Sequence, residues 1–394
     1  MTSMNPSLHV DEGLFSGGPP LGVQKWLRII RSSGDRRVGQ RVLMALVMGW
    51  MPLLVLTAIR EFSAGIPVMH SFLMDAAVHA RSLIAVPLLL IAESDAIPRF
   101  GRAACHFLSS GLVSNQDAPR YSVAAESTRG LLNSRIAEII VFVVSYSIAI
   151  PLVLYLREEL PAWQRDSSTP LGLSVAGLWH ATVSLPLLFT LFLGWFWRIL
   201  LWWRFLYRMS RLDLNLVPAH PDNCGGLLFL STSIRGYRFL ALAFASVVAG
   251  RQLEVILKTG KALSGVQSVV IALLIVVLLL SVGPLLVFTS KMRSAKATGI
   301  FMYGALGREV GTEFERKWLD RDSRVDDSVL QVGDFSTMTD LYQVVGNVYD
   351  MREVPFALRS LQHVVVAALV PFVPVALAAV PLKQILITLA KLVV

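Results

Sequence analysis

The residues best suited to chemistry lie in one short run, His220-Pro221-Asp222-Asn223-Cys224-Gly225-Gly226. An imidazole can orient a neighbouring carboxylate, and two successive glycines can turn their backbone N–H groups toward an anion. A structural role is favoured over ligand binding, because Pro221 and the two glycines suit a tight turn and Asp222 can cap the following helix. One histidine, one aspartate and one cysteine do not complete a metal site, and no nucleophile with its base is recognisable. Neither a metal ligand nor a catalytic residue is therefore predicted.

Glu93 and Asp95 form a second candidate, because both lie in an otherwise apolar stretch. Ionisable groups at membrane depth are costly and are functional candidates by default. On a helix the two side chains point about 200° apart, so one of them at most faces a given cavity. Asp95 can pair with Arg99 four residues later, which favours a structural role for Asp95. For Glu93 the functional and the structural interpretation both stay open.

The elements that position these residues are membrane spans. The chain has 394 residues, of which 54% are hydrophobic and 16% charged, whereas a soluble chain carries about a quarter charged residues. A soluble multi-domain enzyme is thereby excluded. Stretches of about 20 mostly apolar residues predict membrane-spanning helices, and they occur at 42–59, 82–98, 136–156, 175–197, 237–257, 268–290 and 361–382. The expected fold is an all-α transmembrane bundle of about seven spans, within limits of six to eight, with 82–98 the least secure.

The basic residues predict the orientation. Segments 1–41, 99–135, 198–238 and 291–363 hold 27 of the 36 Lys and Arg residues. Such an asymmetry marks the cytoplasmic side of a membrane protein, so we expect a cytoplasmic N-terminus and a C-terminus on the outer side. The same placement explains the net charge of +9 without nucleic acid as a partner. The expected partners are membrane lipids, with anionic headgroups at the cytoplasmic face.

Four regions follow from this pattern. Residues 1–41 are expected to form a cytoplasmic, mostly disordered tail, and 42–290 a six-span bundle with the cytoplasmic loops 99–135 and 198–238. Residues 291–360 are predicted to form a cytoplasmic helical segment, with helices through Trp318 and over 336–352. The last region, 361–394, is predicted to hold the span interrupted by prolines and a short interfacial helix.

Gly304, Gly307 and Gly311 form a strip of small residues along the predicted 291–318 helix. Small residues let two helix backbones approach closely. Packing against another helix of the same chain is favoured. A homo-oligomer or a protein partner bound through 291–360 is the alternative, and it stays open.

One part of the sequence resembles a known family. The run from Phe192 through Trp203 to Leu230, with H-P-D-x-x-G-G-L at its centre, is similar to an uncharacterised family of bacterial multi-pass inner-membrane proteins. Further similarities are Gly333-Asp334-Phe335 with Thr339-Asp340-Leu341, the run Met351-Arg352-Glu353-Val354-Pro355-Phe356, and the proline-interrupted C-terminus. The resemblance covers roughly residues 40–394. It implies the bacterial inner membrane but no established activity, and Asn223-Cys224 departs from the more charged pair that the family pattern would have there.

The candidate residues are predicted to converge on one polar pocket at the cytoplasmic ends of the second, fourth and fifth spans. The pocket would contain Glu93, Arg198, His220 and Asp222. Arg198, or the neighbouring Arg204, is the expected partner of Glu93, because an unpaired carboxylate at this depth would be driven to its neutral form. With Arg198 as the partner, Glu93→Gln should destabilise the protein less than Arg198→Ala, which leaves the carboxylate unpaired.

Three classes of function are compatible with the sequence. A channel or transporter-like component comes first, because broken spans and buried charge are typical of such proteins. The alternative is a membrane scaffold, sensor or assembly factor that presents its cytoplasmic segments to soluble partners. A lipid-headgroup enzyme using His220, Asp222 and Glu93 ranks last. P-loop, dinucleotide and H-E-x-x-H motifs are missing, so no cofactor is predicted.

The orientation can be tested with reporter fusions. Reporters near positions 30, 115, 215 and 325 should report the cytoplasm, and those near 70, 165 and 262 the outer side, because the basic segments are retained inside. A cytoplasmic signal from position 165 would contradict the whole alternation.

Overall fold

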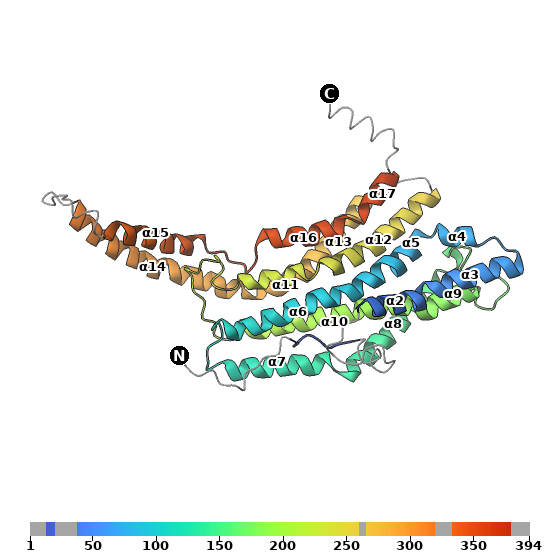
Figure 1. Ribbon diagram of the computed structural model, residues 1–394, viewed down its shortest axis with the longest axis horizontal. Coiled ribbons are helices and arrows are strands. Elements are labelled where there is room, and N and C mark those ends of the chain that lie inside the picture. The colour runs from blue at the N-terminus through green and yellow to red at the C-terminus, as the bar shows by residue number, and fades with distance from the viewer. Residues whose placement is uncertain (1–12, 20–37, 260–264, 320–332, 380–394) are drawn as a thin grey trace, which may run out of the picture.

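The structure is a computed structural model that describes residues 13–19, 38–259, 265–319 and 333–379. Within these residues the regular secondary structure is entirely helical, which confirms the predicted all-α fold. Figure 1 shows a bundle of long, roughly aligned helices from which one helical hairpin projects at an end.

Among the described residues, six helical stretches are long and apolar enough to cross a membrane, or seven if one bent pair counts as a span. The six consist of α2 (Val38–Gly49) with α3 (Met51–Ala64); α5 (Ala76–His79), η1 (Ala80–Ala85) and α6 (Val86–Ser109); α8 (Arg135–Tyr155); α9 (Val175–Trp179), η3 (His180–Ser184) and α10 (Leu185–Ser210); η4 (Leu228–Leu230), α11 (Ser231–Arg235) and α12 (Arg238–Thr259); and α13 (Val266–Val282), η5 (Gly283–Phe288) and α14 (Thr289–Trp318). The pair α16 (Leu358–Leu369) and α17 (Phe372–Ala379) bends by 50°. The remaining helices are α4 (Met69–Leu73), α7 (Ala118–Leu132), η2 (Arg157–Glu159) and α15 (Asp334–Asp350).

The outer surfaces of these helices are apolar. Ile139 and Val143 on α8, and Ile275 and Leu279 on α13, are exposed although they are large hydrophobic side chains. Continuous apolar surface of this kind is unstable in water and is what a lipid-facing helix presents. The protein is therefore a multi-pass membrane protein.

Two of the long stretches contain π-helical turns just before a proline. The turn η1 precedes Pro87, and η3 precedes Pro186. Proline lacks the N–H group of an α-helix and its ring crowds the carbonyl four residues earlier, and a π-turn absorbs this mismatch without ending the helix. Both stretches consequently run unbroken, from Ala76 to Ser109 and from Val175 to Ser210. The stretch at 82–98, the least secure in the sequence, thus belongs to a helix long enough to cross a bilayer.

The centre of the bundle lies between α6 and α10. Helix α6 packs against α2, α10, α11 and α12. Phe100 of α6 stacks on Trp202 of α10 with ring centroids 5.0 Å apart, and Phe205 stacks on the same indole at 5.8 Å. Each aromatic pair stabilises the fold by about 0.5–1.5 kcal/mol beyond its buried area. This aromatic contact fixes the two helices that carry Glu93 and Arg198.

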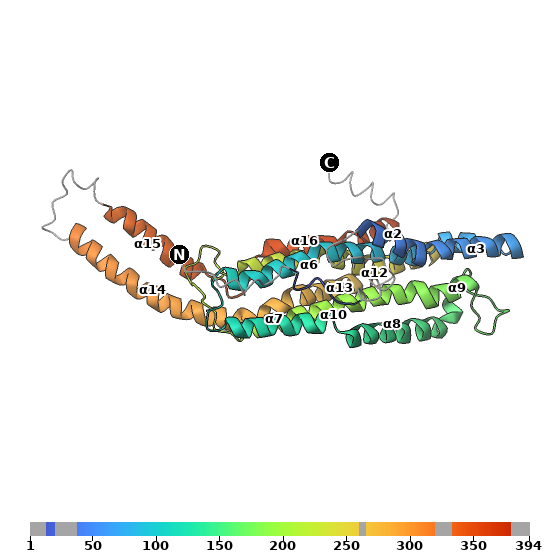
Figure 2. The same cartoon turned by 60° about the horizontal axis from the view of Figure 1, so that its bottom comes forward.

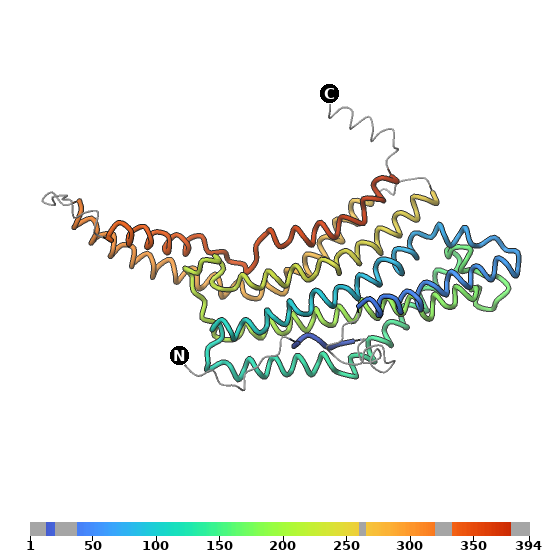
Figure 3. The backbone as a smooth tube through the Cα atoms, viewed as in Figure 1, coloured from blue at the N-terminus to red at the C-terminus, as the bar shows by residue number. Residues whose placement is uncertain are grey.

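The two ends of the bundle separate the connecting segments as the basic residues predict. One end carries α7, the 211–227 connection and the α14–α15 hairpin, and the other carries α4 and the 156–174 connection (Figures 1 and 3). Which end faces the cytoplasm stays a prediction. The interfacial helix expected after Pro381, and most of the loop expected at 320–334, lie outside the described residues.

The glycine strip lies inside the hairpin. Helix α14 reaches Trp318 as predicted and packs along α15 (Figure 2). A methyl group placed on Gly307 would meet Val345 at 3.7 Å, and one on Gly311 would meet Met338 at 3.8 Å. The strip thus packs within one chain, as favoured, but both distances are ordinary van der Waals contacts, so this packing does not require glycine at either position.

Candidate functional site

A buried carboxylate joins three helices. Glu93 of α6 is 4% exposed. Its Oε1 lies 3.0 Å from Nη2 of Arg198 on α10, and its Oε2 lies 2.5 Å from Nη2 of Arg41 on α2. The expected pairing of Glu93 with Arg198 is confirmed. Arg41 is a second partner that the sequence analysis missed, although its place directly before the first apolar stretch was an available signal. We call these three residues the Arg–Glu–Arg cluster.

The Arg–Glu–Arg cluster holds two guanidinium groups against one carboxylate. Arg198, 1% exposed, therefore spreads its charge over further contacts. The centre of its guanidinium lies 5.5 Å from the ring of Trp195, a cation–π distance, and its Nε donates a hydrogen bond of 3.3 Å to the carbonyl of Gly17. Within the part of the chain that the structure describes, its Nη1 has no hydrogen-bond partner. The cluster is thus richer in positive than in negative charge.

A short N-terminal segment covers this cluster. Residues 13–19, here called the strap, place Leu14 and Phe15 in the main core, both essentially inaccessible to solvent. The ring of Phe15 meets Trp202 edge-on at 5.3 Å and Phe100 at 6.0 Å. The strap belongs to the region 1–41 that was expected to be mostly disordered, and the rest of that region before Val38 lies outside the described residues. An apolar Leu-Phe pair inside a polar tail was the only local sign of this docking.

The His-Pro-Asp run forms a turn held by its own backbone. Oδ1 of Asp222 accepts hydrogen bonds from the backbone N–H groups of Cys224 at 2.8 Å and Gly226 at 3.1 Å, and Oδ2 accepts one from Leu228 at 3.1 Å. Nδ1 of His220 lies 2.8 Å from Oδ1. Burial acts to raise the pKa of Asp222, but the three amides and His220 outweigh it, so this pKa lies below its usual value. Both carboxylate oxygens are occupied within the turn, which favours the structural interpretation.

Backbone geometry explains the residue types of this turn. Asn223, Gly225 and Gly226 have φ angles of 53°, 64° and 93°, in the region that glycine adopts without strain and asparagine tolerates. The N–H of Gly226 points to Asp222 rather than to an open site. The anion-binding role considered for the two glycines therefore has no free amide at Gly226 to support it.

A second segment of the resemblance docks on this turn. The N–H of Arg352 donates to the carbonyl of Asn223 at 2.8 Å, and Sγ of Cys224 lies 3.8 Å from the carbonyl of Val354. Burial, with a contribution from Asp222, raises the pKa of the Cys224 thiol to about 11, so the thiol stays protonated and unreactive at neutral pH. The His220–Leu227 motif and the 351–356 run therefore contact one another directly.

The four predicted pocket residues separate into two pairs, which corrects the prediction of one shared pocket. His220 and Asp222 line a cavity of about 540 Å³ together with His106, Gly226 and Arg235. Glu93 and Arg198 do not line it; they face inward between α2, α6 and α10. The reason is that the turn folds outward over Leu112 and Phe229 at the end of the bundle, whereas Glu93 points into the helix packing. Residues predicted to lie at one depth of the spans are therefore found in two separate places.

Other charged residues of the spans have structural partners. Asp95 pairs with Arg99, as predicted, and also with Arg238, each at 2.9 Å. Glu254 pairs with Arg251 at 3.1 Å and with Lys258 at 2.5 Å, as their spacing on α12 indicates. Across the described ranges no group of three or more His, Cys, Asp or Glu side chains could hold a metal ion.

Comparison with protein-family models, with curated proteins and with solved structures finds no match. The resemblance to a bacterial inner-membrane family therefore stays a prediction, and the site must be interpreted from its own geometry.

Because Arg41 and Arg198 share one carboxylate, removing Glu93 should cost more stability than removing Arg41. Glu93→Gln leaves two buried guanidinium groups without a counter-charge and should destabilise the protein by roughly 3–5 kcal/mol. Arg41→Gln should cost less, because Glu93 then still pairs one-to-one with Arg198. Thermal and denaturant unfolding in one detergent measures both, with Glu126→Gln, an exposed carboxylate on α7, as the control. A larger loss from Arg41→Gln than from Glu93→Gln would show that the carboxylate is not shared in this way.

Gly226→Val should lower the folded yield in detergent and cost roughly 1–3 kcal/mol, because a β-branched residue is strained at φ of 93°. Gly130→Val is the matched control, since that glycine lies in helix α7 with open space around it and no positive φ. Size-exclusion profiles and unfolding midpoints of the two variants give the comparison. If Gly226→Val folds normally, a ligand-binding role of the turn regains support.

Proposed function

We propose that the protein is a membrane-anchored scaffold or assembly factor that binds a soluble protein partner through the α14–α15 hairpin. The observation that carries this proposal is the exposed apolar surface of that hairpin, which projects away from the bundle (Figures 1 and 2). Phe301 of α14 is 80% exposed and Tyr342 of α15 is 81% exposed. Large exposed apolar side chains outside the bilayer mark interaction surfaces.

Hydrogen bonds and ring contacts hold the hairpin together and attach it to the bundle. At its base, Lys296 donates a hydrogen bond of 2.7 Å to the carbonyl of Met351, and Lys291 donates one to the carbonyl of Leu212. At its tip, Phe314 meets Phe335 edge-on with centroids 5.1 Å apart. A preformed surface of this kind loses little conformational entropy on binding, which suits a docking function.

The exposed apolar residues of α14 do not suit a membrane span. Phe301, Met302 and Leu306 lie between Lys296 and Arg308. This interval is about twelve residues, far shorter than the roughly 20 needed to cross the hydrocarbon core. Lipid in the bilayer interior therefore does not account for their exposure.

Photo-crosslinking in cells tests the proposal. A photoreactive residue at position 301 or 342 should give a discrete adduct with one and the same soluble protein, identified by mass spectrometry, because a docked partner covers both positions. Ala305→Asp should remove the adduct from position 301, since Ala305 lies one helical turn from Phe301 and a charge there opposes apolar docking. Ser336→Asp, at the far end of the hairpin, is the charge-matched control.

The same crosslinker on the lipid-facing Ile271 of α13 gives the background. Adducts at 301 and 342 that match this background, or that contain lipid alone, would contradict the scaffold function. An adduct with a second copy of the chain would show that the hairpin binds another copy of this protein instead of a soluble partner.

A transporter-like function is the second candidate. The Arg–Glu–Arg cluster between α2, α6 and α10 supports it, as do the π-helical turns of η1 and η3, because such turns are frequent at functional sites. Solute flux into proteoliposomes that depends on Glu93 would favour this candidate over the scaffold.

A further inference from the structure

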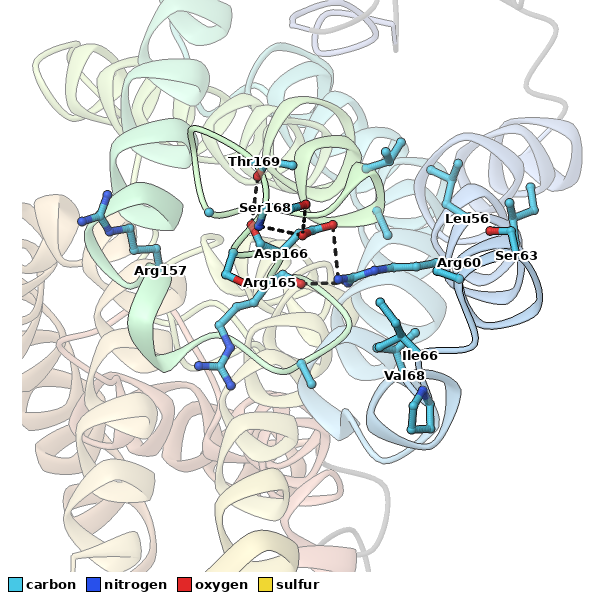
Figure 4. A pocket seen from close by; sticks show the side chains of 18 of the residues that line it. Leu56, Arg60, Ser63, Ile66, Val68, Arg157, Arg165, Asp166, Ser168 and Thr169 are labelled. Carbon is cyan, nitrogen blue, oxygen red and sulfur yellow. Dashed lines mark hydrogen bonds and ion pairs between the residues drawn. The ribbon is translucent and has the colours of Figure 1, made fainter.

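A large cavity opens at the end of the bundle opposite the hairpin. It has a volume of about 1160 Å³ and lies between the end of α3, the segment that follows it, and the 157–172 connection (Figure 4). This volume slightly exceeds the usual range of small-molecule sites, about 300–1,000 Å³. The predicted orientation places the cavity on the outer side of the membrane.

Hydrogen bonds hold the wall of the cavity in place. Arg60 reaches from α3 to the connection, where its Nη1 donates to the carbonyl of Arg165 at 2.7 Å and its Nη2 lies 3.3 Å from Oδ2 of Asp166 (Figure 4). Oδ1 of Asp166 accepts hydrogen bonds from the backbone N–H of Ser168 at 3.0 Å and from its hydroxyl at 2.6 Å. The bonds from Ser168, with a smaller contribution from Arg60, lower the pKa of Asp166. The wall is therefore formed before any ligand arrives.

The charges that line the cavity do not balance. Three guanidinium groups, those of Arg60, Arg157 and Arg165, face two carboxylates. Asp166 is engaged by Arg60, and Glu158 lies 3.3 Å from Arg157. Among the described residues, Arg165 forms no ion pair, and its Nη1 donates only to the carbonyl of Glu158 at 3.3 Å. This bond holds Arg165 beside the backbone of η2, and it leaves the positive charge of Arg165 without a carboxylate partner.

These arginines are unusual for their predicted side of the membrane. Nine basic residues lie outside the four predicted cytoplasmic segments, and three of those nine line this one cavity. Positive charge on the outer side works against the topology signal. Pairing with Asp166 and Glu158 accounts for Arg60 and Arg157, whereas an anionic ligand would supply the partner that Arg165 lacks.

The opposite side of the cavity is apolar and adjoins the lipid-facing surface. Ile59, Ile66 and Val175 line the cavity and are exposed. Ile59 continues the exposed apolar side of α3, one turn after Val55. A ligand that touches both sides needs an anionic group for the arginines and a hydrocarbon part for the isoleucines.

We propose that this cavity binds the phosphate of an anionic phospholipid, with Arg165 contacting the phosphate and Ile59 and Ile66 contacting the acyl chain. Guanidinium groups bind phosphate oxygens bidentately, with geometry that a lone ammonium lacks. Arg60 acts by holding the connection in position. The lipid supplies the negative charge that Arg165 lacks within the protein.

The test is a titration of the purified full-length protein in neutral detergent, followed by microscale thermophoresis. Phosphatidylglycerol should bind more tightly than phosphatidylcholine. Arg165→Gln should lower the affinity for phosphatidylglycerol about tenfold, because one charge-assisted contact is lost. Arg102→Gln is the matched control. Arg102 is likewise exposed, lies at the other end of the bundle and donates one hydrogen bond of 3.3 Å to the carbonyl of Pro98. Its affinity for the lipid should not change.

Two further measurements distinguish a phospholipid from free phosphate as the ligand: binding of inorganic phosphate, and binding of the lipid to Ile66→Asn. Binding of the lipid should fall in Ile66→Asn and exceed that of inorganic phosphate, because the acyl chain adds apolar contact. If inorganic phosphate binds as tightly and Ile66→Asn has no effect, the lipid is overturned as the ligand. Equal binding of the two lipids, or equal losses in Arg165→Gln and Arg102→Gln, would overturn the anion site itself.

Discussion

Charge compensation in a medium without water constrains the most deeply buried charges of this bundle, Glu93 and Arg198. An isolated charge buried among apolar helices costs several kcal/mol, so each ionised group must find its partner within the protein. Glu93 meets this requirement for two arginines at once and thereby joins α2, α6 and α10. Arg198 extends the same connection to the strap through Gly17. One carboxylate therefore links three helices and, through Arg198, the N-terminal segment.

The end of the bundle that carries the hairpin uses backbone amides instead of opposite charges. The carboxylate of Asp222 accepts hydrogen bonds mainly from three N–H groups of its own turn. The carbonyl of Asn223 in the same turn accepts a hydrogen bond from Arg352. A turn closed in this way needs no ligand to be stable. It gives the chain a fixed surface on which the segment between α15 and α16 can dock, and so it determines how the hairpin leaves the bundle.

The two ends differ in what they leave unsatisfied. The α14–α15 hairpin packs its half-buried glycine strip against α15 but leaves the large side chains of Phe301 and Tyr342 exposed. At the opposite end the connection is satisfied in its hydrogen bonds, but Arg165 lacks a counter-charge. Apolar surface in water favours a protein partner, whereas an uncompensated arginine beside apolar side chains favours an anionic amphiphile.

The sequence by itself determined the helical class, the spans and the grouping of the connecting segments at two ends, because apolar length and charge asymmetry act locally along the chain. It also predicted contacts set by helical spacing, such as Asp95 with Arg99 and Arg251 with Glu254. Only the tertiary structure decided that Arg41 shares Glu93, that Phe15 enters the core, and that His220 lies in a different cavity from Glu93. These outcomes depend on which way side chains of distant segments point, and neither spacing nor depth along a span contains that information.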